Sequence, residues 1–445
     1  MRIWFYVGDL LEWLGAGKPV SGVQRVTLEL LRAGLLDKGF RRGEFVPCVR
    51  GSKMGVRPIP LSKVKDILTQ YRNHNEGELH KSMSFSHTII SSIYPIFNIR
   101  QIKTDHIIFT GAIWSKNYED LFIKLNSNRV PFSVLVYDVI PLENPEFVSK
   151  KHYSQFLDWL KTTLSLSTNI FVSSQSLSSK LKKLRVIFDI RDSAPITKIP
   201  FGTESQLKQS TSKLSPWDDT GLSDNPNGFV LSVGTIDRRK NQLMLVEIWA
   251  KLAADEIANL PKLVLAGRLQ AGLETLTEPA RQLIDGGIVQ ILEAPPDSIL
   301  AGLYEDCVFT VFPSLNEGYG LPVVESLCFG KLCVCSDLPE IREFAGDLAW
   351  YFDPTSIPAA YETIRLAIES PEKRRSAEQK ISREFVPTPW SLTLAAMIAG
   401  IERKGPTKGG RHRAAGSADL APGAATAGHD DDPRPVAGHS GKATG

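Results

Sequence analysis

The sequence predicts an α/β fold with two doubly wound, Rossmann-like domains. Strand-like runs of four to six apolar residues alternate with helix-like runs along most of the chain. Continuous apolar runs are typical of parallel strands covered by helices on both faces, and helical crossovers join such strands. The chain has 445 residues, which is long enough for more than one domain of this kind.

The first half of the chain carries strand-like runs before a polar junction. The expected strands are residues 2–7, 106–110, 132–136, 169–173 and 197–200. Residues 52–104 show no clear pattern and are interpreted only as an insertion. The junction is rich in Pro, Gly and Ser, which is typical of interdomain linkers. We therefore expect an N-terminal domain at 1–205 and a linker at 206–227.

The second half alternates more regularly. The expected strands are 229–233, 262–266, 289–292, 308–312, 332–335 and 349–352, and the expected helices are 241–252, 297–304, 322–329 and 338–344. This pattern predicts a C-terminal domain at 228–386, with a last helix at 387–403. Residues 404–445 have almost no large apolar side chains, so we expect them to form a disordered tail.

Charge is distributed unevenly between the two halves. Residues 1–205 contain 28 Lys and Arg against 18 Asp and Glu, whereas residues 206–403 contain 18 against 27. A basic half favours a partner such as nucleic acid, anionic lipid or a phosphorylated ligand. An incidental asymmetry of the solvated surface is the alternative.

Several features favour a cytoplasmic protein. No uninterrupted apolar run is long enough to cross a bilayer. The apolar start of the chain is interpreted as a strand rather than a signal peptide, because Asp9 and Glu12 interrupt it. The five Cys residues lack zinc-ligand spacing and are expected as reduced, buried thiols.

Familiar cofactor and metal motifs are absent from the sequence. No G-x-G-x-x-G string follows the first strand, and Gly15-Ala16-Gly17-Lys18 lacks both the first Gly and the Ser or Thr of a P-loop. No Asp-x-Asp string is suitably placed, since residues 430–432 belong to the predicted tail. We therefore expect no metal and no cofactor.

The stretch from 312 to 325 is the most informative. The strand expected at 308–312 ends at the start of this stretch, and a loop with Gly318 and Gly320 follows it. Pro322 is expected at the start of a helix. Backbone N–H groups in such a loop bind anions, and ligands of open α/β sheets bind outside the carboxyl ends of strands. Glu317 and Glu325, eight positions apart, are expected to bracket the phosphates, with Glu325 in the first helical turn accepting ribose hydroxyls. A simple turn with Glu325 at the helix dipole is the alternative.

A second candidate anion site follows the strand at 229–233. Gly234 and Thr235 end that strand, and Arg239 and Lys240 are expected to open a helix. Cations at a helix N-terminus oppose the helix dipole, which favours a bound anion. A guanidinium forks onto phosphate and an ammonium supplies a point charge. A solvated loop is the alternative.

Together these motifs resemble the retaining glycosyltransferases of family 4, the group 1 glycosyl transferases, which have the GT-B fold. The resemblance rests on E-x7-E at 317–325, on G-T-x-x-x-R-K-N at 234–241 and on S-D-L-P-E at 336–340. It implies two Rossmann-like domains that face across a cleft. The C-terminal domain would bind the nucleotide sugar and the N-terminal domain the acceptor, and the helix at 387–403 would cross back to the N-terminal domain.

The resemblance also implies roles for single residues. Its implied donor-binding residues are Gly22, Gly234, Thr235, Gly318, Tyr319, Gly320, Leu321 and Glu325. Its implied catalytic residues are Glu317, Arg239, Lys240 and Asp138. Tyr137 stands where relatives often carry His, so an imidazole role does not transfer to this chain.

The implied activity is metal-independent, retaining transfer of a hexose from a nucleotide diphosphate sugar, with GDP-mannose favoured, in surface polysaccharide or lipopolysaccharide biosynthesis. The implied partners are that nucleotide sugar and a glycan or polyprenyl-linked acceptor, and not nucleic acid. The alternatives are a nucleotide-sugar epimerase, a glycan phosphorylase or a non-catalytic nucleotide-sugar-binding module.

One further segment is basic and amphipathic. Residues 175–185 place Lys180, Lys182, Lys183 and Arg185 around a face of leucines. Such a helix is typical of peripheral binding to anionic lipid, here at the inner face of the membrane, and equally of a plain surface helix. Both interpretations stay open.

Overall fold

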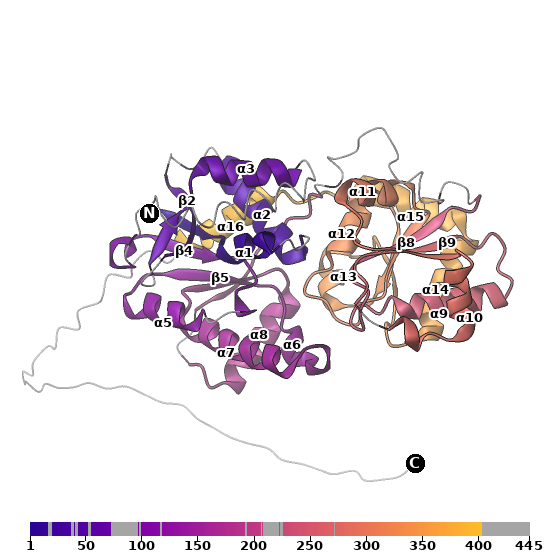
Figure 1. The fold of residues 1–445 in the computed structure, drawn as a ribbon, viewed down its shortest axis with the longest axis horizontal. Coiled ribbons are helices and arrows are strands. Elements are labelled where there is room, and N and C mark those ends of the chain that lie inside the picture. The colour runs from indigo at the N-terminus through magenta and orange to yellow at the C-terminus, as the bar shows by residue number, and fades with distance from the viewer. Residues whose placement is uncertain are drawn as a thin grey trace, which may run out of the picture. The chain divides into compact units, whose positions relative to one another are not determined.

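The structure is a computed structural model with two parallel-sheet α/β domains (Figure 1). It describes residues 1–16, 20–36, 40, 43–51, 55–72, 97, 99–115, 118–191, 194–205, 207, 222, 226–270 and 272–402. The predicted tail at 404–445 lies outside the described residues, as does most of the predicted linker at 206–227. The predicted fold class is confirmed.

The first sheet has seven strands in the order β3-β2-β1-β4-β5-β6-β7. Its strands are β1 (Ile3–Tyr6), β2 (Phe45–Arg50), β3 (Val56–Pro58), β4 (His106–Phe109), β5 (Phe132–Val136), β6 (Asn169–Val172) and β7 (Ile196–Lys198). All neighbours are parallel except β2 and β3, which pair antiparallel at one edge.

The described part of 52–104 is more regular than expected. It holds β3 and the helix α3 (Leu61–Arg72), whereas the sequence was interpreted there only as an insertion. The strand β3 has three residues and ends in a proline, which is tolerated because the strand lies at the sheet edge. Neither alternation nor a long apolar run marks such a segment.

The second sheet has six parallel strands in the order β10-β9-β8-β11-β12-β13. They are β8 (Phe229–Val233), β9 (Lys262–Ala266), β10 (Val289–Leu292), β11 (Phe309–Phe312), β12 (Cys333–Ser336) and β13 (Trp350–Phe352). The strand order reverses direction between β1 and β4 in the first sheet and between β8 and β11 in the second. A ligand crevice is expected at the carboxyl ends of the strands beside each reversal.

Helices cover both faces of each sheet (Figure 1). The remaining elements of the first domain are α1 (Gly8–Gly15), α2 (Gly22–Leu36), η2 (Ile99–Ile102), η3 (Ile113–Ser115), α5 (Glu119–Ser127), α6 (Ile140–Glu143), η4 (Pro145–Phe147), α7 (Lys150–Leu166) and α8 (Gln175–Ile187). Those of the second are α9 (Leu243–Ala254), η7 (Leu273–Thr275), α10 (Glu278–Asp285), α11 (Asp297–Asp306), α12 (Leu321–Cys328), α13 (Pro339–Ala345), α14 (Ile357–Glu369) and α15 (Pro371–Glu384).

The last described helix, α16 (Trp390–Glu402), follows the second sheet in the sequence but packs in the core of the first domain. It lies against α2, and its Leu394 and Met397 side chains are fully buried there. The Trp390 ring contacts Phe201, with ring centroids 5.4 Å apart. Burying these side chains ties the end of the described chain to its beginning.

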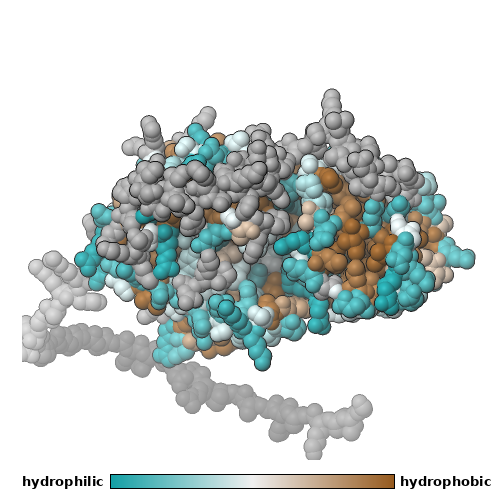
Figure 2. Space-filling view, viewed as in Figure 1, coloured by the Kyte–Doolittle hydropathy of each residue, from teal (hydrophilic) through white to brown (hydrophobic). Residues whose placement is uncertain are grey.

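The described surface is mostly hydrophilic on the face drawn in Figure 2, which also shows one larger hydrophobic area over the second sheet domain. Within the described ranges, no helix combines the length and the apolar character needed to span a bilayer. All five cysteines are buried and carry free thiols, as expected from the sequence.

Candidate functional site

A cavity of about 440 Å³ opens at the carboxyl ends of the strands, between the two sheet domains. The first domain contributes the start of α2, the residues after β5 and Phe201 to its wall. The second contributes the loops after β8, β9, β10 and β11. Every candidate site residue named from the sequence lines it: Gly22, Asp138, Gly234, Thr235, Arg239, Lys240, Glu317, Gly318, Tyr319, Gly320, Leu321 and Glu325.

The loop between β11 and α12 forms the centre of the cavity wall. Gly320 precedes α12 and has φ of 100°, a left-handed conformation that favours glycine. Pro322 lies in the first turn of α12, where its missing N–H costs no hydrogen bond. Glu325 is the fifth residue of the helix rather than part of its first turn, so the helix-dipole alternative for Glu325 loses its geometric basis.

Glu317 is buried between two cations. Its Oε1 lies 2.9 Å from Arg239 Nη1 and 2.6 Å from Lys240 Nζ. Burial raises the pKa of the Glu317 carboxyl, but the charges of Lys240 and Arg239 outweigh this effect and hold its pKa below the ordinary value. Burial lowers the pKa of Lys240, and Glu317 opposes that change. The three groups together carry one net positive charge at the cavity wall.

Arg239 and Lys240 do not open a helix as predicted. They lie in the turn that precedes α9, which starts at Leu243. Asn241 has φ of 58°, so the chain adopts a left-handed conformation between the cations and the helix. The helix-dipole argument for a bound anion therefore does not apply. Instead the turn is fixed by Leu315 N–H, which donates to the Arg239 carbonyl at 2.8 Å.

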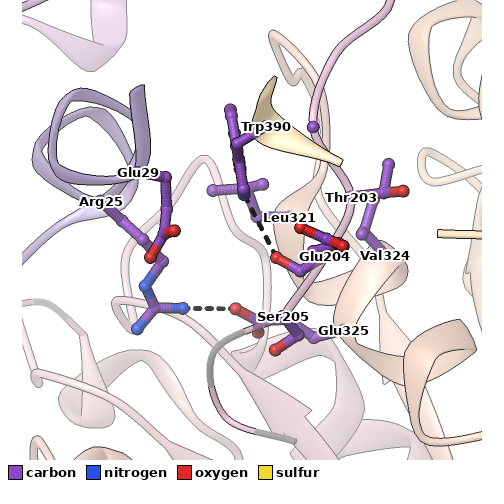
Figure 3. A pocket seen from close by; sticks show the side chains of 10 residues that line it. Arg25, Glu29, Thr203, Glu204, Ser205, Leu321, Val324, Glu325 and Trp390 are labelled. Carbon is purple, nitrogen blue, oxygen red and sulfur yellow. Dashed lines mark hydrogen bonds and ion pairs between the residues drawn. The ribbon is translucent and has the colours of Figure 1, made fainter. Parts of the chain in front are cut away.

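The Glu325 carboxylate receives hydrogen bonds from both domains. Tyr304 Oη donates to its Oε2 at 2.8 Å, and the guanidinium of Arg25 in α2 binds its Oε1 (Figure 3). The same guanidinium lies 3.0 Å from Asp297 Oδ1 at the start of α11. Burial raises the pKa of Glu325, and the charge of Arg25 opposes that rise. A carboxylate accepts about four hydrogen bonds, so two positions remain for a ligand.

Arg25 is a site residue that the sequence did not indicate. It lies one turn after Gly22 on α2, so both residues face the second domain. Its partner Glu325 lies 300 positions away in the sequence. The one sequence signal that could have indicated Arg25 is its position three residues after Gly22.

The two domains approach closely at Gly318. A Cβ atom placed there would lie 2.4 Å from the Tyr137 carbonyl oxygen and 3.0 Å from the Cβ of Asp138. Any larger residue would push the domains apart at this point. Glycine is thus required here for the contact between the strand ends of β5 and β11.

Tyr137 and Asp138 differ in what they offer the cavity. The Tyr137 hydroxyl donates to the Thr110 carbonyl within the first domain, and burial raises its pKa. It is therefore held as a neutral group directed toward its own sheet. Asp138 Oδ1 accepts from Ile140 N–H at 3.0 Å, and burial raises the pKa of this carboxyl too.

The described residues hold no cluster of three or more His, Cys, Asp or Glu side chains that could bind a metal ion.

Known proteins are similar to this chain in sequence. Residues 217–383 match the profile of the family described as glycosyl transferases group 1. The chain is 23% identical to the serotype-specific mannosyltransferase WbdA of Escherichia coli over 411 residues, covering 86% of this chain and 46% of that protein. It is 29% identical to the O-antigen chain mannosyltransferase B of Escherichia coli over 150 residues, covering 34% and 39% of the two chains. The chain thus spans less than half the length of these curated relatives.

Solved structures share the fold. Anabaena HepE in complex with UDP and glucose superposes with a TM-score of 0.57 at 16% identity, covering 91% of this chain and 99% of that one. WaaG, a glycosyltransferase involved in lipopolysaccharide biosynthesis, superposes with a TM-score of 0.57 at 13% identity, covering 91% and 100%. The protein is therefore of the GT-B class. Its residues 217–383, which hold most of the second sheet domain, match the glycosyl transferases group 1 family, in agreement with the resemblance found in the sequence.

The Arg25–Glu325 contact gives a first prediction. In Arg25→Ala, the largest effect that opposes burial is lost and only the Tyr304 hydrogen bond remains, so the pKa of Glu325 rises further and its carboxyl is protonated at higher pH. We expect nucleotide affinity near neutral pH to fall about tenfold, which corresponds to one charged hydrogen bond of about 1.5 kcal/mol. Raising the pH should restore part of the nucleotide affinity, because the Glu325 carboxyl then loses its proton. Titration calorimetry with GDP and UDP between pH 6 and 8.5 measures both effects.

Arg32→Ala provides the control, because Arg32 lies on the same helix outside the cavity and pairs with Glu29. It should bind nucleotide like the wild type. If Arg25→Ala matched that control at every pH, Arg25 would have no part in supporting Glu325.

Proposed function

We propose that this protein is a metal-independent, retaining glycosyltransferase. It transfers a hexose from a nucleoside diphosphate sugar to a hydroxyl of a glycan or polyprenyl-linked acceptor in surface polysaccharide biosynthesis. The observation that carries the proposal is the Glu317–Arg239–Lys240 cluster, which lines one cavity together with Asp138. Two of the relatives are named as a serotype-specific mannosyltransferase and an O-antigen chain mannosyltransferase, and these names favour GDP-mannose as the donor.

The cations are placed to bind the donor diphosphate. Arg239 and Lys240 line the cavity beside Gly320 and the N-terminus of α12, where backbone N–H groups point at an anion. With Glu317 neutralising one of the two charges, the cluster keeps one positive charge for the diphosphate. Cations fixed in this way stabilise the negative charge that develops on a leaving diphosphate, as a metal ion does in other transferases.

Glu325 and Glu317 then have separate roles. Glu325 accepts the two ribose hydroxyls with the positions that Arg25 and Tyr304 leave free. Glu317 lies at the diphosphate end of the cavity, where its carboxylate keeps Arg239 and Lys240 in position beside the sugar. We therefore assign nucleoside binding mainly to Glu325 and turnover mainly to Glu317.

We propose the following reaction for this placement of residues. The acceptor oxygen forms a bond to the anomeric carbon as the bond from that carbon to the diphosphate breaks, and the electron pair leaves with the diphosphate. When the acceptor approaches the same face of the sugar, a diphosphate oxygen takes the acceptor proton. Configuration is then retained without a separate base. Asp138 lies against Gly318, next to Glu317, and lines the same cavity, and we assign it to holding a sugar hydroxyl.

Turnover tests this proposal. The protein is incubated with GDP-mannose, UDP-glucose or dTDP-glucose and a lipid-linked or glycan acceptor in the presence of EDTA, and products are analysed by mass spectrometry and NMR. We expect transfer with the α-configuration of GDP-mannose conserved. Lys240→Ala and Glu317→Ala should each lower turnover by about a hundredfold or more, the usual cost of losing one charge-stabilising group.

Lys251→Ala serves as the matched control, since Lys251 is exposed on α9 away from the cavity. It should leave turnover unchanged. Strict dependence on Mn²⁺ would contradict metal independence, and an inverted product would contradict retention. Isomerised free donor would identify an epimerase, phosphate-dependent release of sugar a phosphorylase, and binding without turnover a non-catalytic module.

We also propose that α8 contacts an anionic membrane surface at its cytoplasmic face. Only part of its basic face is available for this. Lys180 Nζ lies 3.0 Å from Glu143 and 2.9 Å from Glu340, and Arg185 donates to the Ala194 carbonyl. These two residues are engaged within the protein.

The other face of α8 is exposed. Lys182 and Lys183 lie one turn before Val186 and Ile187, whose side chains are 81% and 72% exposed. Two basic residues contribute about 1 kcal/mol each near an anionic surface, and two inserted apolar side chains add to that. This combination suits a transferase whose acceptor is anchored by a polyprenyl chain.

Co-sedimentation with vesicles tests the membrane proposal. We expect binding to phosphatidylglycerol vesicles at low salt, release at high salt and loss in the double variant Lys182→Gln/Lys183→Gln. Val186→Ser/Ile187→Ser should weaken binding at both salt concentrations. Lys373→Gln/Arg375→Gln removes two exposed basic residues from α15 and should bind like the wild type. Equal binding to neutral and anionic vesicles would contradict the proposal.

A further inference from the structure

The cavity has one wall that the diphosphate and the ribose leave unused. Arg239 and Lys240 mark the phosphate end, and Glu325 marks the ribose. The rest of the wall is formed by the loops that follow β9 and β10 and by the start of α11, and it includes Arg268, Pro295 and Leu300. On the proposed function this wall is left for the base of the nucleotide.

Arg268 is held rigidly on that wall. A Cβ atom on the preceding Gly267 would lie 1.9 Å from the Gly234 carbonyl oxygen, so the ends of β8 and β9 are in direct contact. The Arg268 carbonyl accepts from Ile236 N–H at 2.8 Å, and the next residue, Leu269, forms a bridge with Ile236. The backbone that carries the Arg268 side chain is therefore fixed beside the phosphate loop.

The Arg268 guanidinium has no polar partner among the described residues, unlike the other two arginines of the cavity. Arg25 binds Glu325 and Asp297, and Arg239 binds Glu317. Arg268 is half-buried and lines the cavity. Because the side chain is only half-buried, its N–H donors are available to a ligand that presents acceptors.

A guanidinium donates hydrogen bonds and accepts none, which restricts the bases it can bind. Guanine presents two adjacent acceptors, O6 and N7, which match the two prongs of an arginine fork. Uracil and thymine present a single carbonyl on the corresponding edge, and adenine and cytosine present an amino group there. We propose that Arg268 determines base specificity by binding O6 and N7 of guanine, with Pro295 and Leu300 against the faces of the base.

This inference rests on the proposed function, since it assigns the base of the same donor. Titration calorimetry in EDTA compares GDP, inosine diphosphate, 7-deaza-GDP and UDP. Inosine diphosphate keeps O6 and N7, so we expect it to bind the wild type about as well as GDP does. We expect 7-deaza-GDP, which lacks the N7 acceptor, and UDP to bind at least tenfold more weakly.

Arg268→Ala should lower GDP affinity by about tenfold to a hundredfold and remove the difference between GDP and 7-deaza-GDP. Arg268→Lys keeps the charge but loses the fork, so it should also fail to distinguish these two ligands. Arg281→Ala on the exposed face of α10 is the control and should keep wild-type selectivity. Unchanged melting curves would show that the variants fold.

Two results would overturn this inference and leave the transferase proposal standing. One is a wild-type protein that prefers UDP. The other is an Arg268→Ala variant that weakens GDP, 7-deaza-GDP and UDP equally, which would place Arg268 on the diphosphate. Failure of the wild type to bind any nucleoside diphosphate would instead overturn the proposed function itself.

Discussion

The site depends on the pairing of one buried carboxylate with two cations. Without Glu317, burying Arg239 and Lys240 side by side would be unfavourable, and burial already lowers the pKa of Lys240. With it, the carboxylate opposes the lowering of the Lys240 pKa and holds both cationic side chains at the cavity wall. The loops after β8 and β11 come together around this cluster, and the Leu315–Arg239 backbone hydrogen bond ties them directly.

The same site depends on both domains. The first domain supplies Arg25 to Glu325 and brings the Asp138 strand end against Gly318. On the far side of this contact, Glu343 of α13 accepts from Gln175 and Ser176 N–H at 2.7 and 2.8 Å, and so caps α8 of the first domain. The candidate donor-binding residues are therefore positioned by contacts across the cavity as well as by their own sheet.

Sequence reasoning found the parts of the site that are local in the chain. The regular alternation gave most strands to within two residues, and the glycines and glutamates of 317–325 marked the central loop because their spacing carries the chemistry. It did not find Arg25, whose contact partner Glu325 lies 300 positions away. It included Lys180 in the basic face for which lipid binding was one of two interpretations, since nothing near Lys180 in the sequence shows that Glu340 approaches it. It also put Arg239 and Lys240 at a helix start, because the left-handed turn at Asn241 has no strong sequence signal.

The most direct test of this account compares the binding of GDP and GMP in EDTA. If Arg239 and Lys240 hold the diphosphate without a metal, the β-phosphate adds charge-assisted hydrogen bonds of about 1.5 to 3 kcal/mol. GDP should then bind at least tenfold more tightly than GMP, and the difference should narrow in high salt. Equal affinity for the two nucleotides, or a preference for GDP that appears only with added divalent metal, would contradict the account.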